Sequence, residues 1–570
     1  MEYQTLVSIY EDIAATAADT EKTALLADAL ETTDAELLGP VVLLLQGKLF
    51  PSHSDAELGI SSSLASDAIA KATGVSEQAI EAQWAETGDL GDVALWAVDN
   101  REQQTLFRQA LDVQTVFETL REAATYEGNG SQQRRIDAVA DLLGDADPNE
   151  ARWVVRTALG HLRIGIGEGT LRDAIAQALL RDTEENADGR IEAVERAYQV
   201  TNDYPVVAET AREHGLDGLD ALDVELFRPI DVMLATKAQS LADGIESVAE
   251  NREDVLAEYK YDGVRAQIHV DGQDVRVFTR RLTEITEQFP DVVQAIRAHV
   301  ETDRAILEAE LVAYDPATGD PVPFQRLSKR IKRKYGVQEL AEEVPVTVFL
   351  FDLIYEDESL LETPLRERLA RLEATIDPEP QVVERARAIE FASAEKDGFQ
   401  DRAVAFYEDA LGAGQEGIMT KNLAATYQPG TRVGYMMKIK PVMEPLDLVV
   451  TRAQYSEGRR SEWLGRLFLG AYDPEAEEFR EVGRLSTGYT DEELDALTDD
   501  LEALVEGQDG RQVQLRPEVV LEVAYEEIQA SPEYDSGYAL RFPRFEKRRP
   551  ELAPTDADTV ERVERLYEEQ

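Results

Sequence analysis

The sequence has no cysteine and only five histidines among its 570 residues. The absence of cysteine excludes disulfide bonds, thiolate nucleophiles, iron–sulfur clusters and every zinc site that has a cysteine ligand. The histidines show no metal-ligand spacing, since they are scattered at His53, His161, His214, His269 and His299. A bound metal is therefore expected to be a hard cation held by oxygen atoms, such as magnesium.

Long apolar runs are also absent. No stretch approaches the roughly 18 consecutive apolar residues of a membrane span. The opening residues, MEYQT, lack the basic and apolar regions of a secretion signal. We therefore expect a cytoplasmic protein that has no membrane contact.

Positive charge is scarce. Asp and Glu number 114 against 58 Lys and Arg, which gives a formal net charge of −56. Only 13 of the basic residues are lysines, and eight of these lie between Lys260 and Lys440. Many carboxylates with little lysine favour a protein adapted to molar salt, as in a halophile, because the Debye length there is about 3 Å and self-repulsion is screened. An acidic interaction surface is the alternative explanation.

The pattern of apolar residues changes along the chain, and the length suggests three or four domains. Residues 1–226 are predicted to be all-helical, because apolar side chains recur every three to four positions, as in 24–30, 136–143 and 171–179. Residues 227–444 are predicted to form an α+β domain with strands at 265–270, 275–278, 305–312 and 346–351. Residues 445–570 are predicted to form a small β-barrel with strands at 447–451, 467–472 and 519–525.

One lysine occupies the most distinctive motif, Glu258-Tyr259-Lys260-Tyr261-Asp262-Gly263-Val264-Arg265. A lone Lys-x-Asp-Gly is weak evidence, because Asp-Gly is also a common hairpin turn. A lysine amine at a turn can nevertheless attack an electron-poor centre when burial and neighbouring cations favour its neutral form.

Other groups that nucleotidyl transfer requires follow over about 180 residues. Glu310 and Glu416 could hold magnesium or ribose hydroxyls, and Phe351 could stack on a base. Phosphates could be neutralised by Arg265, Arg280, Lys421, Lys438 and Lys440. Taken singly, residues such as Glu310 and Phe351 are more often strand residues with packing or surface roles, and Lys438 and Lys440 alternate as in a half-exposed strand, so the evidence lies in the combination.

In this combination and order, the chain resembles the ATP-dependent DNA ligases of the archaeal and eukaryotic replicative type. The resemblance implies that Lys260 becomes adenylated, that Glu258 reads the adenine side of the pocket, and that Arg265 contacts ribose or phosphate. It assigns the metal to Glu310 and Glu416, with Glu310 also near the ribose. The resemblance further implies that Phe351 stacks on adenine and that Arg280 meets the nucleotide or the 5′-phosphate of the nick. The remaining implied contacts are Arg432 and Lys438 at the nucleotide, and Lys421 and Lys440 at phosphates.

The resemblance also implies an architecture and a reaction. It predicts a helical DNA-binding domain over 1–226, an adenylation domain over 227–444 and an OB-fold domain over 445–570. The cofactors would be ATP and Mg²⁺, and the substrate would be nicked double-stranded DNA, sealed by a monomer in replication, repair and recombination. The segment Arg163–Arg172 matches a DNA-binding part of the family, and its glycines suit close approach to phosphates.

Two short segments differ from the rest in how closely they match the family. Where the family usually has Arg-x-Asp-Lys, this chain reads Arg549-Pro550-Glu551-Leu552, so Arg549 is a candidate phosphate contact without the lysine. The segment Gln103–Phe107 resembles the sliding-clamp peptide of archaeal ligases, although the start of an amphipathic helix explains it equally well.

Several alternatives remain open. RNA ligases and capping guanylyltransferases share the lysine motif, but the long helical region favours nicked duplex DNA. NAD-dependent ligases carry a cysteine zinc module, which this chain lacks. A catalytically dead DNA-binding scaffold need not keep Lys260 together with Glu310 and Glu416.

The acidity leads to one further expectation. A protein of charge −56 that binds DNA must present a local basic channel. We also expect its DNA binding to weaken less steeply with salt than is usual.

Overall fold

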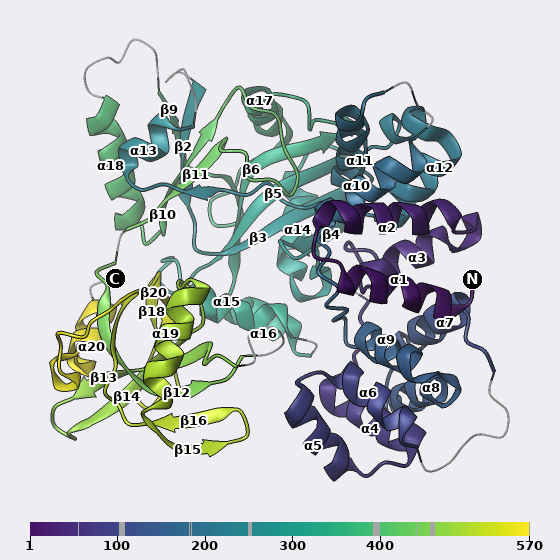
Figure 1. The fold of residues 1–570 in the computed structure, drawn as a ribbon. Helices are drawn as coiled ribbons and strands as arrows, with labels where there is room; N and C mark the ends of the chain where they lie inside the picture. Colours follow the sequence, from purple (N-terminus) through teal and green to yellow (C-terminus); the bar gives the residue numbers. More distant parts are fainter. Residues whose placement is uncertain are drawn as a thin grey trace. The chain divides into compact units, whose positions relative to one another are not determined.

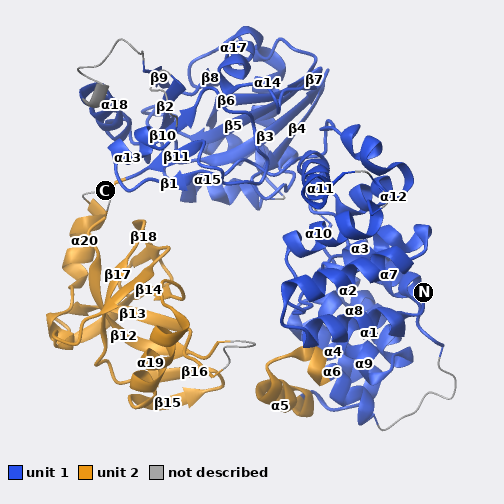
Figure 2. Cartoon of the chain, turned by 45° about the horizontal axis from the view of Figure 1, so that its top comes forward, with its two compact units in different colours: residues 1–77, 94–440 blue, residues 78–93, 441–570 orange. Residues whose placement is uncertain are grey.

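The computed structural model describes residues 1–570 except 55, 102–108, 182, 184, 249–253, 334, 392–398, 442, 457–461 and 569–570. The chain forms two compact units, residues 1–77 with 94–440 and residues 78–93 with 441–570 (Figure 2). Helices make up the N-terminal part, and most strands follow residue 254 (Figure 1). Among the described residues, no helix has the length and apolar character needed to cross a membrane.

The N-terminal region, here called the helical region, is all-helical, which confirms the prediction from apolar periodicity. Its helices are α1 Tyr3–Ala15, α2 Asp19–Thr32, α3 Leu38–Leu45, α4 Ser62–Thr73, α5 Glu77–Thr87, α6 Leu90–Asp99, α7 Val113–Ala124, α8 Ser131–Asp145, α9 Pro148–Ala158, α10 Glu168–Leu179, α11 Ala187–Thr201 and α12 Tyr204–Asp220. Local sequence sets where they begin. At α9, for example, Asp147 and Glu150 form a capping box and Pro148 takes the first helical position.

The loop before α10 is held in place by a buried lysine. Lys22 of α2 donates a hydrogen bond of 2.7 Å to the carbonyl oxygen of Gly165. Arg163 and Gly165 have positive φ angles of 59° and 67°, so the loop turns sharply before the helix. The predicted DNA-binding segment therefore has a fixed backbone.

The α+β part of the chain up to Lys440, which carries most of the predicted site residues and is here called the catalytic region, is built on two sheets. One sheet has the order β1-β11-β10-β2-β9, with β1 Thr236–Lys237, β2 Val255–Lys260, β9 Ala388–Glu390, β10 Gly417–Asn422 and β11 Met436–Ile439. The other has the order β4-β3-β5-β6-β7 with β8 paired to β6, and comprises β3 Val264–Asp271, β4 Asp274–Thr279, β5 Arg304–Ala313, β6 Val346–Glu356, β7 Glu358–Ser359 and β8 Val383–Arg385. The helices are α13 Leu241–Glu246, α14 Pro290–His299, α15 Phe324–Ile331, α16 Val337–Glu343, α17 Leu365–Thr375 and α18 Phe399–Gly412.

Strand β3 has an apolar and a polar face. Ala266, Ile268 and Val270 belong to the main core, which also takes side chains from β5, α14 and α17. The alternate residues of β3 are polar, and they face the segment that enters from the helical region. The two faces follow from the period of two in a strand.

The C-terminal part is a β-rich OB region, which confirms the predicted barrel. Its elements are β12 Leu446–Gln454, β13 Arg466–Asp473, β14 Glu478–Leu485, α19 Asp491–Glu502, β15 Val505–Asp509, β16 Gln512–Leu515, β17 Val520–Ala524, β18 Glu527–Ala530, β19 Tyr538–Arg541, β20 Arg544–Arg548 and α20 Val560–Glu568. Strand β12 pairs with β13, β16 and β17 and changes register between Val450 and Arg452. Such an irregularity bends a strand and lets a sheet curl.

Candidate active site

Three antiparallel strands bring the predicted site residues together. Lys260, the last residue of β2, lies opposite Gly417 of β10, and Met419 lies between Glu258 of β2 and Lys438 of β11. Gly417 has a φ of 135°, and a Cβ atom there would overlap the carbonyl oxygen of Ile439. Glycine is therefore required where β10 begins, directly after Glu416.

Glu416 is held between two lysines. Its carboxylate forms an ion pair with Lys260 and a second one with Lys440, whose Nζ lies 2.9 Å away. Burial acts to raise the pKa of Glu416, but the two ammonium groups outweigh burial and lower the pKa to about 2. Glu416 is therefore ionised at every physiological pH.

Glu310 of β5 lies close to the same lysine, but its pKa is shifted in the opposite direction. It is the register partner of Arg265, and Gly263 makes room for it, because a Cβ atom there would lie 2.9 Å from Cγ of Glu310. Burial raises the pKa of Glu310 to about 7, and this outweighs Lys260 and Arg265, which act to lower it. The carboxyl group is therefore partly protonated near neutral pH.

The two carboxylates have the donor chemistry that magnesium prefers. The described residues contain no group of three or more His, Cys, Asp or Glu side chains placed to hold a metal ion. A magnesium ion at Glu310 and Glu416 would therefore complete its coordination with water and phosphate oxygens, as is usual for this ion.

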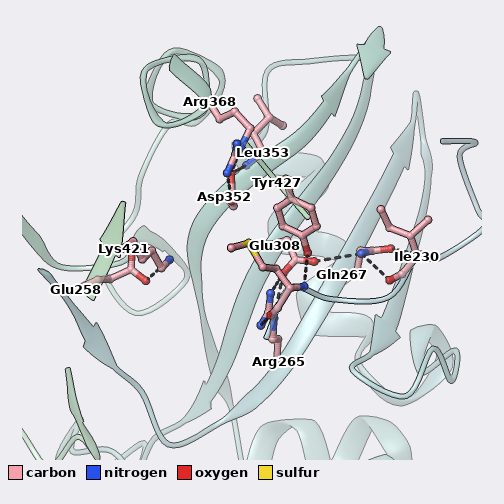
Figure 3. A network of polar contacts seen from close by, with 11 residues as sticks. Ile230, Glu258, Arg265, Gln267, Glu308, Asp352, Leu353, Arg368, Lys421 and Tyr427 are labelled. Carbon is pink, nitrogen blue, oxygen red and sulfur yellow. Dashed lines mark hydrogen bonds and ion pairs between the residues drawn. The ribbon is translucent and has the colours of Figure 1, made fainter. Parts of the chain in front are cut away.

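Glu258 and Lys421 form a buried pair, shown in Figure 3. Their side chains are 5% and 7% exposed, and the nitrogen and oxygen lie 2.7 Å apart. Lys421 also lies 4.5 Å from the ring centroid of Phe351, and Arg265 lies 5.4 Å from it. Two cations thus lie near the ring of Phe351, and Lys421, the predicted phosphate contact, is paired with Glu258.

Arg265 takes its position from residues that the sequence analysis did not single out. It forms an ion pair with Glu308, which is fully buried, and donates a hydrogen bond of 3.0 Å to the carbonyl oxygen of Met233. Glu308 also accepts a hydrogen bond of 3.1 Å from Gln267 (Figure 3). The Arg265 side chain is therefore fixed before any nucleotide arrives.

Gln267 and His269 extend this arrangement along the polar face of β3. The amide of Gln267 pairs with both backbone groups of Ile230, at 3.0 Å and 3.3 Å. His269 accepts a hydrogen bond of 2.9 Å from the backbone N–H of Phe227 at Nδ1. Burial lowers the pKa of His269 to about 3, so it is neutral and its Nε2–H donates to Gln267 at 2.9 Å.

Together these contacts tie the connecting segment, residues 227–233, to the polar face of β3. Three side chains at alternate positions of one strand bond to successive parts of this segment. The sequence contains a signal for this polar face, because Arg265, Gln267 and His269 alternate with apolar residues. A second missed pair, Asp352 with Arg368, is buried beside Phe351 at 2.7 Å.

The remaining predicted residues lie further out. Arg280 follows β4, is exposed, and lines a pocket with Arg172 and Glu168 of the helical region. Arg432 is exposed in the loop between β10 and β11. In the other unit, Arg549 is bound to carboxylates of Asp447, Glu522 and Glu551 at 2.8, 2.7 and 2.6 Å. The segment Gln103–Phe107 lies outside the described residues.

A lysine at a strand end, paired with a carboxylate and flanked by a second carboxyl group, an aromatic ring and further cations, is the arrangement of a covalent nucleotidyltransferase. Family models match in three consecutive parts: DNA ligase N terminus over 2–176, ATP dependent DNA ligase domain over 232–440 and ATP dependent DNA ligase C terminal region over 460–552. The chain belongs to the ATP-dependent DNA ligases, is of the archaeal type, and seals nicks in DNA.

Individual relatives agree over the full length. The DNA ligase of Thermococcus onnurineus strain NA1 is 41% identical over 569 residues, which cover 100% of this chain and 98% of the relative. The DNA ligase of Halobacterium salinarum strain R1 is 41% identical over 585 residues and 100% of both chains. A solved structure titled Pmar-Lig_Pre has a TM-score of 0.59 at 16% identity, covers 95% of this chain and 99% of its own, and supports the fold alone.

Proposed function

We propose that this ligase works through a lysine–AMP intermediate on Lys260 and that Glu310 and Glu416 hold magnesium. The observation that carries the proposal is the convergence of Lys260, Glu416 and Lys440 beside Glu310. A bound magnesium ion would neutralise negative charge on the phosphate oxygens.

The first step transfers AMP to the protein. Neutral Lys260 attacks the α-phosphorus of ATP, so that a P–N bond forms and the P–O bond to pyrophosphate breaks. Lys260 must first separate from Glu416 and lose a proton. The pKa of Glu416 near 2 makes it a poor proton acceptor, so we assign it the roles of charge partner and metal ligand.

Two further displacements complete the reaction. A 5′-phosphate oxygen of the nick attacks the AMP phosphorus, which breaks the P–N bond and releases Lys260. The 3′-hydroxyl then attacks the 5′-phosphate, and AMP leaves as the strand is sealed. Throughout, Phe351 stacks on adenine, and Arg265, fixed by Glu308, contacts the ribose or a phosphate.

Other residues receive finer roles on the same basis. We assign Glu258 to the adenine side of the pocket, Arg280, Arg432 and Lys438 to the nucleotide, and Lys421 and Lys440 to phosphates. Arg549 can reach a phosphate only after leaving its three carboxylates. We further propose that the enzyme is a monomer, acts in the cytoplasm, and contacts a sliding clamp through Gln103–Phe107.

The test is incubation with α-labelled ATP and magnesium at high KCl, followed by a denaturing gel. The wild type and Lys71→Ala are expected to retain label, because Lys71 is an exposed lysine of the helical region paired with Asp137. Lys260→Ala is expected to retain none. Label on Lys260→Ala at the wild-type level would contradict the assignment.

A further inference from the structure

Helix α15 and the turn that follows it carry the densest run of positive charge in the chain. Six of the nine residues from Arg326 to Lys334 are basic, and no Asp or Glu occurs from 321 to 338. The chain as a whole has 114 acidic against 58 basic residues. The local excess is therefore opposite in sign to the rest of the protein.

One face of α15 anchors the helix. Leu327 is buried in the main core, and Arg330 is only 1% exposed. The Arg330 guanidinium pairs with Asp291 and donates to the backbone oxygens of Val344 at 2.9 Å and Gln288 at 3.1 Å. Arg330 thus serves the fold, and its charge is already matched.

The exposed side of the helix is open. Arg326 and Lys329 lie on the helix, and Lys332 and Arg333 follow its last residue, Ile331. All four are exposed, and none forms an ion pair with a carboxylate in the described part of the chain. Beyond them, the ring of Tyr335 is 85% exposed. We call the four cations the basic surface. Arg333 donates one hydrogen bond of 2.8 Å to the backbone oxygen of Tyr335, which leaves its positive charge without a carboxylate. Four cations without carboxylate partners stand out in a chain of charge −56.

The basic surface begins at the catalytic turn. The carboxylate of Asp262, two residues after Lys260, accepts a hydrogen bond of 3.0 Å from the backbone N–H of Phe324, the first residue of α15. A helix of eight residues is about 12 Å long. Along a DNA strand, about 12 Å corresponds to roughly four nucleotides at 3.4 Å each.

We propose that the basic surface binds the phosphate backbone of the nicked duplex within about four nucleotides of the nick. DNA fits the surface better than an acidic protein does, because the reacting phosphate must reach Lys260, and the backbone on one side of it then runs close to α15. The cations also oppose the repulsion that the acidic remainder of the chain exerts on DNA.

The experiment compares two double variants with equal loss of charge. Lys329→Gln with Lys332→Gln removes half of the basic surface. Arg366→Gln with Arg371→Gln removes two half-exposed, paired arginines of α17 in the same region. Binding to a nicked duplex is measured by anisotropy over a series of KCl concentrations, and ATP-dependent labelling of the protein, which needs no DNA, reports an intact nucleotide site.

The lysine variant is expected to show a plot of log K against log salt that is shallower by up to about 1.8, since each phosphate contact contributes about 0.9. The arginine variant is expected to keep the wild-type slope. Equal slopes for both variants and the wild type would overturn the proposal, and so would an equal change of slope in the two variants. A loss of ATP-dependent labelling in the lysine variant would also overturn it.

A scan of the DNA locates the contact. Neutral methylphosphonates placed singly at the four phosphates on either side of the nick should weaken binding by the wild type at particular positions. The same substitutions should have no effect on the lysine variant, because the partner charge is already missing. Additive losses at every position would overturn the proposal. A lysine variant that binds DNA as the wild type does but no longer captures an acidic protein would also overturn it.

Discussion

Replacing Glu310 by glutamine is expected to stabilise the protein free of metal and nucleotide, and at the same time to impair nucleotidyl transfer. Burial raises the pKa of Glu310 from an ordinary value of 4.5 to about 7. The folded protein therefore binds this proton more tightly than the unfolded chain does. Its contribution to stability is complete below about pH 4.5 and is lost as the pH rises through 7.

The magnitude follows from the difference between the two pKa values. Each pKa unit corresponds to about 1.4 kcal/mol, so complete ionisation of Glu310 costs about 3 kcal/mol. Because this carboxyl is only partly shielded from solvent, we expect about 2 to 3 kcal/mol. Glutamine keeps the shape and removes the charge, so Glu310→Gln should gain this amount over the wild type between pH 4.5 and pH 8.

The assay is unfolding at fixed KCl with EDTA present, after pyrophosphate has removed AMP from Lys260. The free energy of unfolding of the catalytic region is followed from pH 4.5 to 8. Glu416→Gln is the matched control with the opposite sign: the depressed pKa of Glu416 stabilises the protein above about pH 4.5, and this contribution is lost as the pH falls towards 2. Parallel pH profiles for the wild type and Glu310→Gln would refute the reasoning.

Three further predictions concern the connecting segment, salt and the clamp. Gln267→Leu removes the side chain that bonds to the backbone of Ile230 and the carboxylate of Glu308, which should cost about 3 kcal/mol of stability and raise KM for ATP. The control Ile268→Val, on the apolar face of the same strand, should cost about 1 kcal/mol and leave KM unchanged. Equal KM values for the two variants would contradict this. The unfolding midpoint should rise from low to multi-molar KCl, and greatest stability at low salt would exclude salt adaptation. Phe107→Ala should reduce capture by the sliding clamp in a pull-down, and undiminished capture would reject this contact.

Much of the fold follows from residue patterns. The run 265–270 predicts β3, and the structure extends it by one residue at each end. Periodicity works for β3 because Ala266, Ile268 and Val270 bury one continuous face of the strand in the main core. It does not reveal that the helical and catalytic regions pack together, since residues such as Val200 and Ile306 meet in one cluster only through tertiary contacts.

The sequence predicts the candidate site as a set of residues but does not predict how they pair. The sequence places Lys260 and Glu416 in separate motifs, and only the pairing of β2 with β10 brings them together. Arg265 is the register partner of Glu310, yet its ion pair is with Glu308. The register and the direction in which a long side chain extends depend on neighbouring strands, and the sequence does not specify them.

The pairing divides five of the scarce lysines into two groups with different tasks. Lys260 and Lys440 share Glu416, and Lys421 is buried against Glu258, so the field of these lysines is cancelled locally. Such lysines attract a distant polyanion weakly, but they are already placed for an incoming phosphate. Lys329 and Lys332 have no such partner among the described residues and project into solvent. Attraction of DNA and chemistry on the nucleotide therefore fall to different lysines, which explains how so acidic a chain can bind DNA without a basic overall charge.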